Sequence, residues 1–264
     1  MQAMNEHQND LAREGVVRMR AVFSLGRMAE VRAEYEAHNA FAEQREAPKG
    51  EPIVVYWTHI QGERKRITLL HSMPVMTELA GDVAEIVRQF VPGQTLRLLE
   101  TIIFNKPPKA SGELRWHQDV SYFPFEPNNQ LAAWLPFDPV GPDNGCLVYA
   151  LGSHLLGLRA STDLHSGEPF AGETREPIPD RPDWWGHREQ RMLMMPGDML
   201  IHDGRTWHRS GPNTTENEQR RGLSLRFLVG DTYYKPRPGS AAAFMKQLDV
   251  KEGDLINDPA FPVI

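Results

Sequence analysis

The chain has 264 residues, of which 40% are hydrophobic and 24% charged, and a formal net charge of -6 at pH 7, the composition of a globular protein with a sizeable core. The negative charge, with no basic block, argues against a nucleic-acid partner, and the lack of a run of about 18 apolar residues argues against a membrane-spanning helix. The single cysteine, Cys146, excludes an intrachain disulfide and a zinc–thiolate cluster and favours a reducing cytoplasm.

The first part of the chain predicts two helices after a short strand that follows Gly15. Apolar residues recur among charged ones over residues 26–45, which indicates an amphipathic helix. A second helix is predicted over 74–90, where the apolar residues fall on one side and Pro92-Gly93 provides the end.

From residue 95 onward the pattern changes to short apolar stretches separated by clusters of Pro, Gly, Asn and Asp, which is typical of β-strands and turns. Helices followed by many short strands predict a mainly β fold with flanking α-helices. We expect a double-stranded β-helix core, which is a jelly-roll, cupin-like double sheet, in a single domain over residues 1–264. The predicted strands are 95–104, 130–137, 145–151, 191–195, 198–202 and 222–229.

The segment 155–190 departs from this strand pattern. It is rich in Pro, Gly and charged residues and carries Trp184 and Trp185. Long insertions of this kind in compact domains are usually functional or mobile. We therefore predict that it is a lid over a binding site.

Two imidazoles and one carboxylate form a candidate metal site. His117 and Asp119 are two residues apart, so on a strand both would point to one face while Gln118 points away. His208, downstream of a predicted strand, offers the third ligand. Two histidines and one carboxylate form the ligand set of non-heme Fe(II) oxygenases. The His-x-Asp pattern alone is weak, because a surface histidine near a turn aspartate produces it equally well.

Arg220 lies twelve residues after His208 and is a candidate partner for an anionic cosubstrate. A buried guanidinium pairs with a carboxylate through two parallel hydrogen bonds, which suits the distal carboxylate of 2-oxoglutarate. The alternative, that Arg220 and Arg221 form a solvated surface, has about equal weight on spacing alone.

Taken together, the motifs over about residues 10–235 resemble the phytanoyl-CoA dioxygenase family of Fe(II)- and 2-oxoglutarate-dependent oxygenases. The matching pieces, in order, are Asn105-Lys106-Pro107-Pro108, His117-Gln118-Asp119 with Tyr122-Phe123-Pro124-Phe125, Asn144-Gly145-Cys146-Leu147, Gly152-Ser153-His154, Gly197-Asp198, His208-Arg209-Ser210-Gly211-Pro212-Asn213 and Arg220.

The resemblance implies a role for each matching position. Iron would be bound by His117, Asp119 and His208, and 2-oxoglutarate by Arg220, Ser210, Trp134, Ile102 and a basic residue that best matches Arg66, with Lys65 and Arg64 as adjacent alternatives. The chain departs from the family at Arg209, where a small residue is common. This cation would narrow or polarise the substrate side of the site.

By this resemblance, Fe(II), 2-oxoglutarate and O2 would serve the hydroxylation of an unactivated C–H bond, with release of succinate and CO2. Asp119 favours hydroxylation over halogenation, because related halogenases carry a small residue there. Desaturation or cyclisation stays open, as do a non-catalytic metal-binding jelly roll and, with less support, a zinc hydrolase. The substrate would be a small organic molecule: a fatty acyl group, an amino acid or a natural-product intermediate. Its identity and the oligomeric state do not follow from the sequence.

Overall fold

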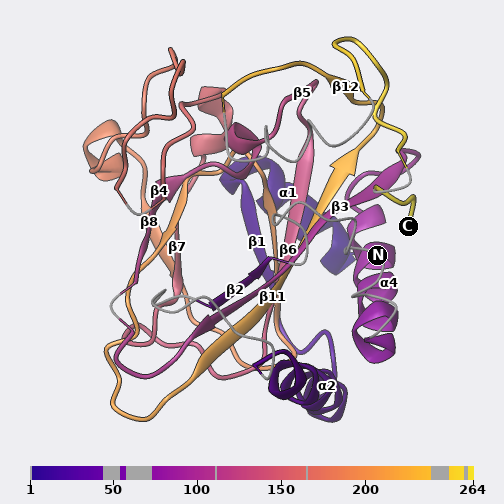
Figure 1. Cartoon of the computed structure of the whole chain (residues 1–264), viewed down its shortest axis with the longest axis vertical. Helices are drawn as coiled ribbons and strands as arrows, with labels where there is room; N and C mark the ends of the chain where they lie inside the picture. Colours follow the sequence, from indigo (N-terminus) through magenta and orange to yellow (C-terminus); the bar gives the residue numbers. More distant parts are fainter. Residues whose placement is uncertain are drawn as a thin grey trace.

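Two antiparallel β-sheets form the body of the molecule in the computed structural model (Figure 1), as the sequence predicts. The structure describes residues 2–43, 54–57, 73–110, 112–164, 166–238, 250–258 and 261–264. The major sheet has the order β1 (Val16–Met19), β9 (Met199–Asp203), β6 (Gln130–Pro136), β11 (Arg220–Val229), β3 (Leu96–Lys106) and β2 (Val54–Trp57). The minor sheet has the order β4 (Leu114–His117), β10 (His208–Ser210), β7 (Leu147–Ala150) and β8 (Glu189–Met192), and β12 (Tyr233–Tyr234) pairs with β5 (Phe125–Glu126).

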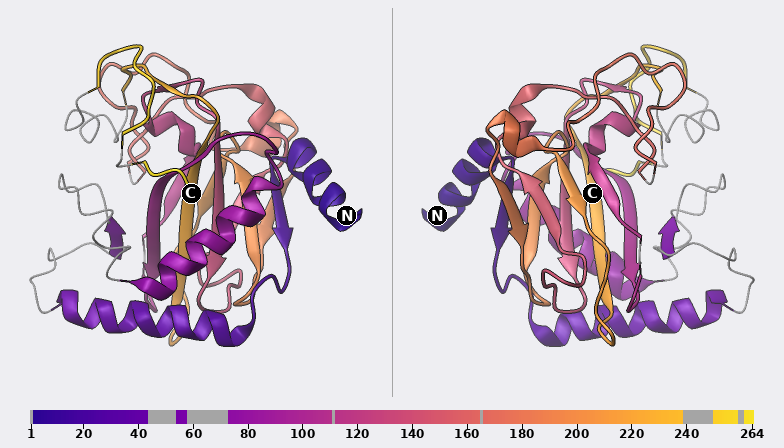
Figure 2. Two further views of the ribbon diagram at one scale, coloured as in Figure 1. Left: turned by 90° about the vertical axis from the view of Figure 1, so that its right-hand side faces the viewer. Right: turned by 90° about the vertical axis from the view of Figure 1, so that its left-hand side faces the viewer.

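Helices cover one face of the major sheet (Figure 2). Helix α4 (Pro74–Arg88) crosses this face and contacts α2 (Leu25–Glu43), while α1 (Gln2–Glu14) packs beside β1. Both α2 and α4 contribute apolar residues to the cluster that they share with the sheet. Of the helices that the structure describes, none combines the length and the hydropathy needed to cross a membrane.

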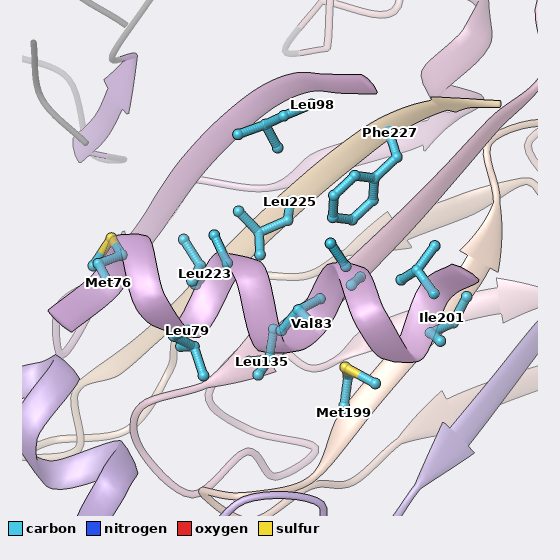
Figure 3. Packing of buried hydrophobic residues seen from close by; sticks show 14 of the residues in the cluster. Met76, Leu79, Val83, Leu98, Leu135, Met199, Ile201, Leu223, Leu225 and Phe227 are labelled. Carbon is cyan, nitrogen blue, oxygen red and sulfur yellow. The ribbon is translucent and has the colours of Figure 1, made fainter. Parts of the chain in front are cut away.

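Strand alternation on β11 separates this core from the space between the sheets. Leu223, Leu225 and Phe227 point toward α4, as Figure 3 shows. Successive side chains of a strand point to opposite faces, so the residues between them point to the minor sheet. Arg220 and Arg226 therefore face the space between the two sheets, where the candidate site lies.

A β-bulge on β3 directs the side chains of Glu100 and Lys106 toward the same space. The register with β11 passes from Arg226 opposite Glu100 to Phe227 opposite Leu98, which leaves Leu99 without a partner of its own. Leu98 therefore packs in the core beneath α4 (Figure 3), whereas Glu100 and the alternate residues after it lie on the other face.

Most predicted elements are present, with boundaries that differ by a few residues. Helix α4 ends at Arg88, before the predicted stop, and β8 begins at Glu189 rather than at residue 191. The prediction of a strand through residue 195 is wrong, because Leu193 and Met195 are exposed and only an isolated bridge joins Met194 to Val140. Helix α1 and the strands β2, β5, β10 and β12, which are short or polar, were not predicted.

Candidate metal and cosubstrate site

The three predicted metal ligands lie together between the sheets. His117 on β4 and His208 on β10 are direct register partners, and their ring centroids are 4.1 Å apart. Nε2 of His117 and Nε2 of His208 lie 3.8 and 3.6 Å from Oδ1 of Asp119. All three residues are buried, and one ligand atom from each lies within 4.8 Å of the others. This arrangement suits one ion with open coordination positions.

Backbone carbonyls orient both imidazoles for metal binding. Nδ1 of His117 lies 2.7 Å from the oxygen of Arg115, and Nδ1 of His208 lies 2.9 Å from that of Thr206. A carbonyl oxygen only accepts, so each Nδ1 carries the proton and donates it, and each Nε2 presents its lone pair to the site. Burial lowers the pKa of both imidazoles, which favours the neutral form that binds a metal.

Asp119 is held as a carboxylate by groups on the major sheet. Nη2 of Arg226 donates to its Oδ1 over 2.7 Å, and Nε2 of His202 lies 3.1 Å from its Oδ2. Although burial alone favours the neutral acid, the charge of Arg226 and the hydrogen bond with His202 hold the pKa of Asp119 well below its usual range. His202 in turn contacts the hydroxyl of Tyr149 over 3.0 Å. His202 thus supports the candidate ligand Asp119.

The prediction that Asp119 lies on a strand is wrong. Strand β4 ends at His117, and Asp119 begins the 3-10 helix η1 (Asp119–Tyr122). The residue between them, Gln118, keeps an extended backbone, so the two candidate ligands still point the same way. The side chain of Gln118 points away, where its amide donates to the backbone oxygens of Gly157 and Arg205.

Arg220 is fully enclosed and has unused hydrogen-bonding capacity. Only 2% of its surface is exposed, and its guanidinium carbon lies 4.8 Å from the ring centroid of Trp134. Among the described residues, its Nε and Nη2 atoms have no hydrogen-bond partner. Burial lowers the pKa of Arg220 to about 10, which still leaves it cationic at neutral pH. A buried cation with free donors fits a ligand carboxylate, and this is the chemistry that 2-oxoglutarate offers.

Gly222 makes room for the indole beneath Arg220. A Cβ atom on Gly222 would lie 2.1 Å from Cζ2 of Trp134. We expect Gly222→Ala to displace the indole, to weaken 2-oxoglutarate binding and to lower the stability by about 1–3 kcal/mol through overpacking. Kinetics at varied 2-oxoglutarate and thermal unfolding measure the two effects. Gly141→Ala is the control, because its Cβ would meet nothing within 4 Å. Unaltered KM and Tm in Gly222→Ala would contradict this view of the pocket.

The other predicted cosubstrate residues differ in how the structure places them. Trp134 and Ser210 line the same cavity as Arg220, and the Ser210 hydroxyl donates to the oxygen of Gly145 over 2.9 Å. Ile102 is buried and, by alternation, shares a face with Phe104, which lines the cavity. Residues 64–66, which include the predicted Arg66 and its neighbours Arg64 and Lys65, lie outside the described residues. The cavity is lined by Phe104, Leu114, His117, Asp119, Trp134, Leu147, Tyr149, His202, His208, Ser210, Arg220, Ser224 and Arg226.

Arg209 points away from the candidate metal cavity. Its neighbours in β10, His208 and Ser210, line the cavity, and alternation directs Arg209 to the outer face of the minor sheet. There its guanidinium carbon lies 5.2 Å from the ring centroid of Trp116, and Nη2 lies 3.4 Å from Glu189. Arg209 therefore does not line the metal cavity. It lines a separate cavity with Trp116, His187 and Glu189, and its effect on the substrate side stays a prediction.

Comparison with known proteins places the chain among oxygenases. The family model described as phytanoyl-CoA dioxygenase (PhyH) matches residues 11–222. Human peroxisomal phytanoyl-CoA dioxygenase is 28% identical over 147 residues, which are 54% of this chain and 42% of the human protein. A probable alpha-ketoglutarate-dependent hypophosphite dioxygenase from Stutzerimonas stutzeri is 27% identical over 152 residues, 57% of this chain and 51% of that protein. The chain thus matches about half the length of these relatives, or less.

Two solved structures resemble this one over almost its whole length. The epimerase SnoN, in complex with Fe3+, alpha ketoglutarate and nogalamycin RO, has a TM-score of 0.76 and 24% identity, and the match covers 99% of this chain and 98% of SnoN. The carbocyclase SnoK from nogalamycin biosynthesis has a TM-score of 0.72 and 22% identity, with 98% and 95% of the two chains covered. These likenesses show a shared fold.

Proposed function

The chain belongs to the phytanoyl-CoA dioxygenase family of Fe(II)- and 2-oxoglutarate-dependent oxygenases, and on this premise we propose that it hydroxylates an unactivated C–H bond of a small organic molecule. The observation that carries the proposal is a buried cavity that combines a candidate metal site with a free carboxylate-binding group. The triad of His117, Asp119 and His208 lines the same cavity as Arg220, whose guanidinium keeps donors free for a carboxylate.

Each part of this cavity has a task in the proposed reaction. His117, Asp119 and His208 would hold Fe(II), while Arg220 would bind the distal carboxylate of 2-oxoglutarate, with Ser210 beside it and Trp134 supporting the guanidinium. Once bound there, the metal and 2-oxoglutarate would supply, together with O2, the oxidation of the substrate coupled to conversion of 2-oxoglutarate into succinate and CO2. Burial of the ligands between two sheets excludes water from the reacting atoms.

A second candidate function is cyclisation or epimerisation without insertion of oxygen. It is favoured by the full-length likeness to the epimerase SnoN and the carbocyclase SnoK. Such outcomes need hydrogen abstraction from carbon, as hydroxylation does, and differ in how the substrate is positioned afterwards.

A zinc hydrolase has less support from the site. Zinc metalloproteases of the H-E-x-x-H type use a free carboxylate next to the metal as the general base. Among the described residues that line the cavity, Asp119 is the only carboxylate, and it is a candidate ligand. Glu100 nearby is already paired with Arg226.

Turnover with isotopically labelled dioxygen tests the proposal. The Fe(II)-loaded protein would be incubated with 2-oxoglutarate, 18O2 and a panel of fatty acyl, amino-acid and polycyclic natural-product substrates. We expect succinate to form and a product to gain one 18O atom. A product without the label would favour cyclisation or epimerisation, whereas no iron-dependent succinate with any substrate would contradict an oxygenase.

We also propose that the segment 155–190 closes over the substrate. Its beginning is tied to the metal site, because Gln118, between two candidate ligands, accepts from the backbone amide of Arg159 and donates to the oxygen of Gly157. At its far end Trp184 and Trp185 are 77% and 55% exposed, so they are not core residues in this state. Exposed indoles on such a segment are available to cover a bound molecule.

Replacing both tryptophans by alanine is expected to uncouple the reaction. Without the indoles, water reaches the reacting atoms, so the ratio of succinate to oxidised product should rise while iron and 2-oxoglutarate still bind. Leu25→Ala, which removes another exposed apolar side chain outside the segment, is the control. Limited proteolysis should also cut residues 155–190 less when substrate is bound. An unchanged ratio together with equal cutting would identify a rigid insertion.

A further inference from the structure

Lys106 is a fully buried lysine next to the proposed cosubstrate site. It is the last residue of β3 and the register partner of Arg220, the first residue of β11. Its exposed surface is 0%. Lysine is almost never buried completely unless its ammonium group has partners. The position therefore calls for an explanation in terms of those partners.

The ammonium of Lys106 is bound by three backbone carbonyls from two segments. Nζ donates to the oxygens of Gly112 and Ser210, each over 3.2 Å, and to the oxygen of Gly211. A protonated lysine has three N–H donors, so three acceptors match its charged form. Gly112 precedes β4, which carries His117. Ser210 is the last residue of β10, which carries His208, and Gly211 follows it. The side chain of Lys106 thus connects β3 to β4 and β10, the strands that carry the two candidate iron histidines.

We propose that Lys106 is a positioning residue for the cosubstrate: its ammonium holds the ends of β4 and β10 against β3, and so sets Ser210 and Arg220 at the spacing that a 2-oxoglutarate carboxylate requires. This inference rests on the proposed function and deepens it, because it adds a group that acts through Ser210 and Arg220 without touching the cosubstrate.

Charge couples Lys106 to the cosubstrate as well. Burial, together with the adjacent Arg220, lowers the pKa of Lys106 to about 7. The opposing groups are Glu113, from the loop before β4, and Cys146, from the loop before β7, which both raise it. A carboxylate bound at Arg220 offsets the positive charge that disfavours protonation of Lys106. The pKa of Lys106 is therefore higher in the complex, and binding of 2-oxoglutarate takes up a proton.

The direction of the pH dependence follows from this shift. Below pH 7 Lys106 is charged in both states, so the affinity for 2-oxoglutarate is at its maximum. As the pH rises through about 7 toward the higher pKa of the complex, the affinity falls, by up to about tenfold per pH unit. A lysine without electrostatic coupling to the bound cosubstrate would produce no such slope.

Calorimetry of 2-oxoglutarate binding tests the proposal on the whole Fe(II)-loaded protein under anaerobic conditions, from about pH 6 to about pH 9. In wild type we expect the affinity to fall over this range, and proton uptake to appear as a dependence of the heat on the buffer. Lys106→Met should bind about tenfold or more weakly at the acidic end, with little pH dependence, because the charge-assisted contacts are gone. Lys109→Met, three residues away and exposed with an ion pair to Glu216, should behave as wild type.

Three results would overturn the inference. One is wild-type binding without proton uptake at about pH 8, a measurement that does not depend on any variant folding. Another is a Lys106→Met protein with the wild-type affinity and pH profile. The last is a wild-type protein that binds no 2-oxoglutarate at any pH, which would remove the proposed function as well. The first two results leave that function intact.

Discussion

Replacing His208 by alanine is expected to abolish iron binding and turnover. The residue is buried, its Nε2 faces Asp119 at 3.6 Å, and its Nδ1 is fixed by the oxygen of Thr206. The variant keeps two of the three protein ligands. Loss of a residue that only hydrogen-bonds to a metal ligand typically lowers metal affinity by roughly 10–100-fold, and the loss of His208 itself should lower the affinity for Fe(II) by more than that. Iron stoichiometry after anaerobic loading measures the loss, and His117→Ala should behave in the same way.

The control for this experiment is another histidine outside the triad. His187 contacts the backbone oxygen of Leu151 and packs against Trp207, so His187→Ala should retain a full complement of iron. If His208→Ala retained iron as well, His208 would leave the ligand set. His202, which already contacts Asp119, would then be the first residue to examine.

The second large effect is expected for Arg220→Ala. A 2-oxoglutarate carboxylate in this buried cavity would lose its charge-assisted donors, which costs about 2–5 kcal/mol, so the KM for 2-oxoglutarate should rise by about 30-fold or more. The kcat at saturating 2-oxoglutarate should change much less, because the iron ligands are untouched. Initial rates at varied 2-oxoglutarate provide the measurement.

Arg221 supplies a matched control for Arg220. It is the next residue in β11, but it points to the opposite face, where it pairs with Asp138 and Glu36. Arg221→Ala should therefore leave the 2-oxoglutarate KM unchanged, even if it lowers the stability. An unchanged KM in Arg220→Ala would assign the carboxylate to another basic residue. Arg226 fits that task less well, because it is paired with Asp119 and Glu100.

Local pattern predicted the strands well, because alternation and turn residues are properties of neighbouring positions. It failed at Asp119, because β4 ends at His117 and only Gln118 continues the extended backbone before the 3-10 helix η1 begins. The backbone amide of Val120 donates to the oxygen of Gly204, a partner from a distant loop that the sequence around Asp119 does not reveal. The common direction of His117 and Asp119 was nevertheless predictable, because it needs only one extended residue between them.

The groups around the candidate ligands were harder to predict, because they depend on the register of strands far apart in the chain. Lys106 meets Arg220 only through the pairing of β3 with β11, and the bulge at Leu99 decides which face Glu100 shows. The outward direction of Arg209 was hard to predict for a related reason. Its place in the motif suggested the site, but the alternation of β10, which the sequence analysis did not assign, directs it outward.

The visible spectrum of the anaerobic complex tests the central claim most directly. Fe(II) chelated by the keto acid of 2-oxoglutarate gives a metal-to-ligand charge-transfer band, which requires the metal and the cosubstrate in one site. We expect the band when Fe(II) and 2-oxoglutarate are added together to the wild-type protein, and its loss in His208→Ala. In Arg220→Ala it should appear only at much higher 2-oxoglutarate. Wild-type protein that binds Fe(II) but shows no band at saturating 2-oxoglutarate would contradict the account.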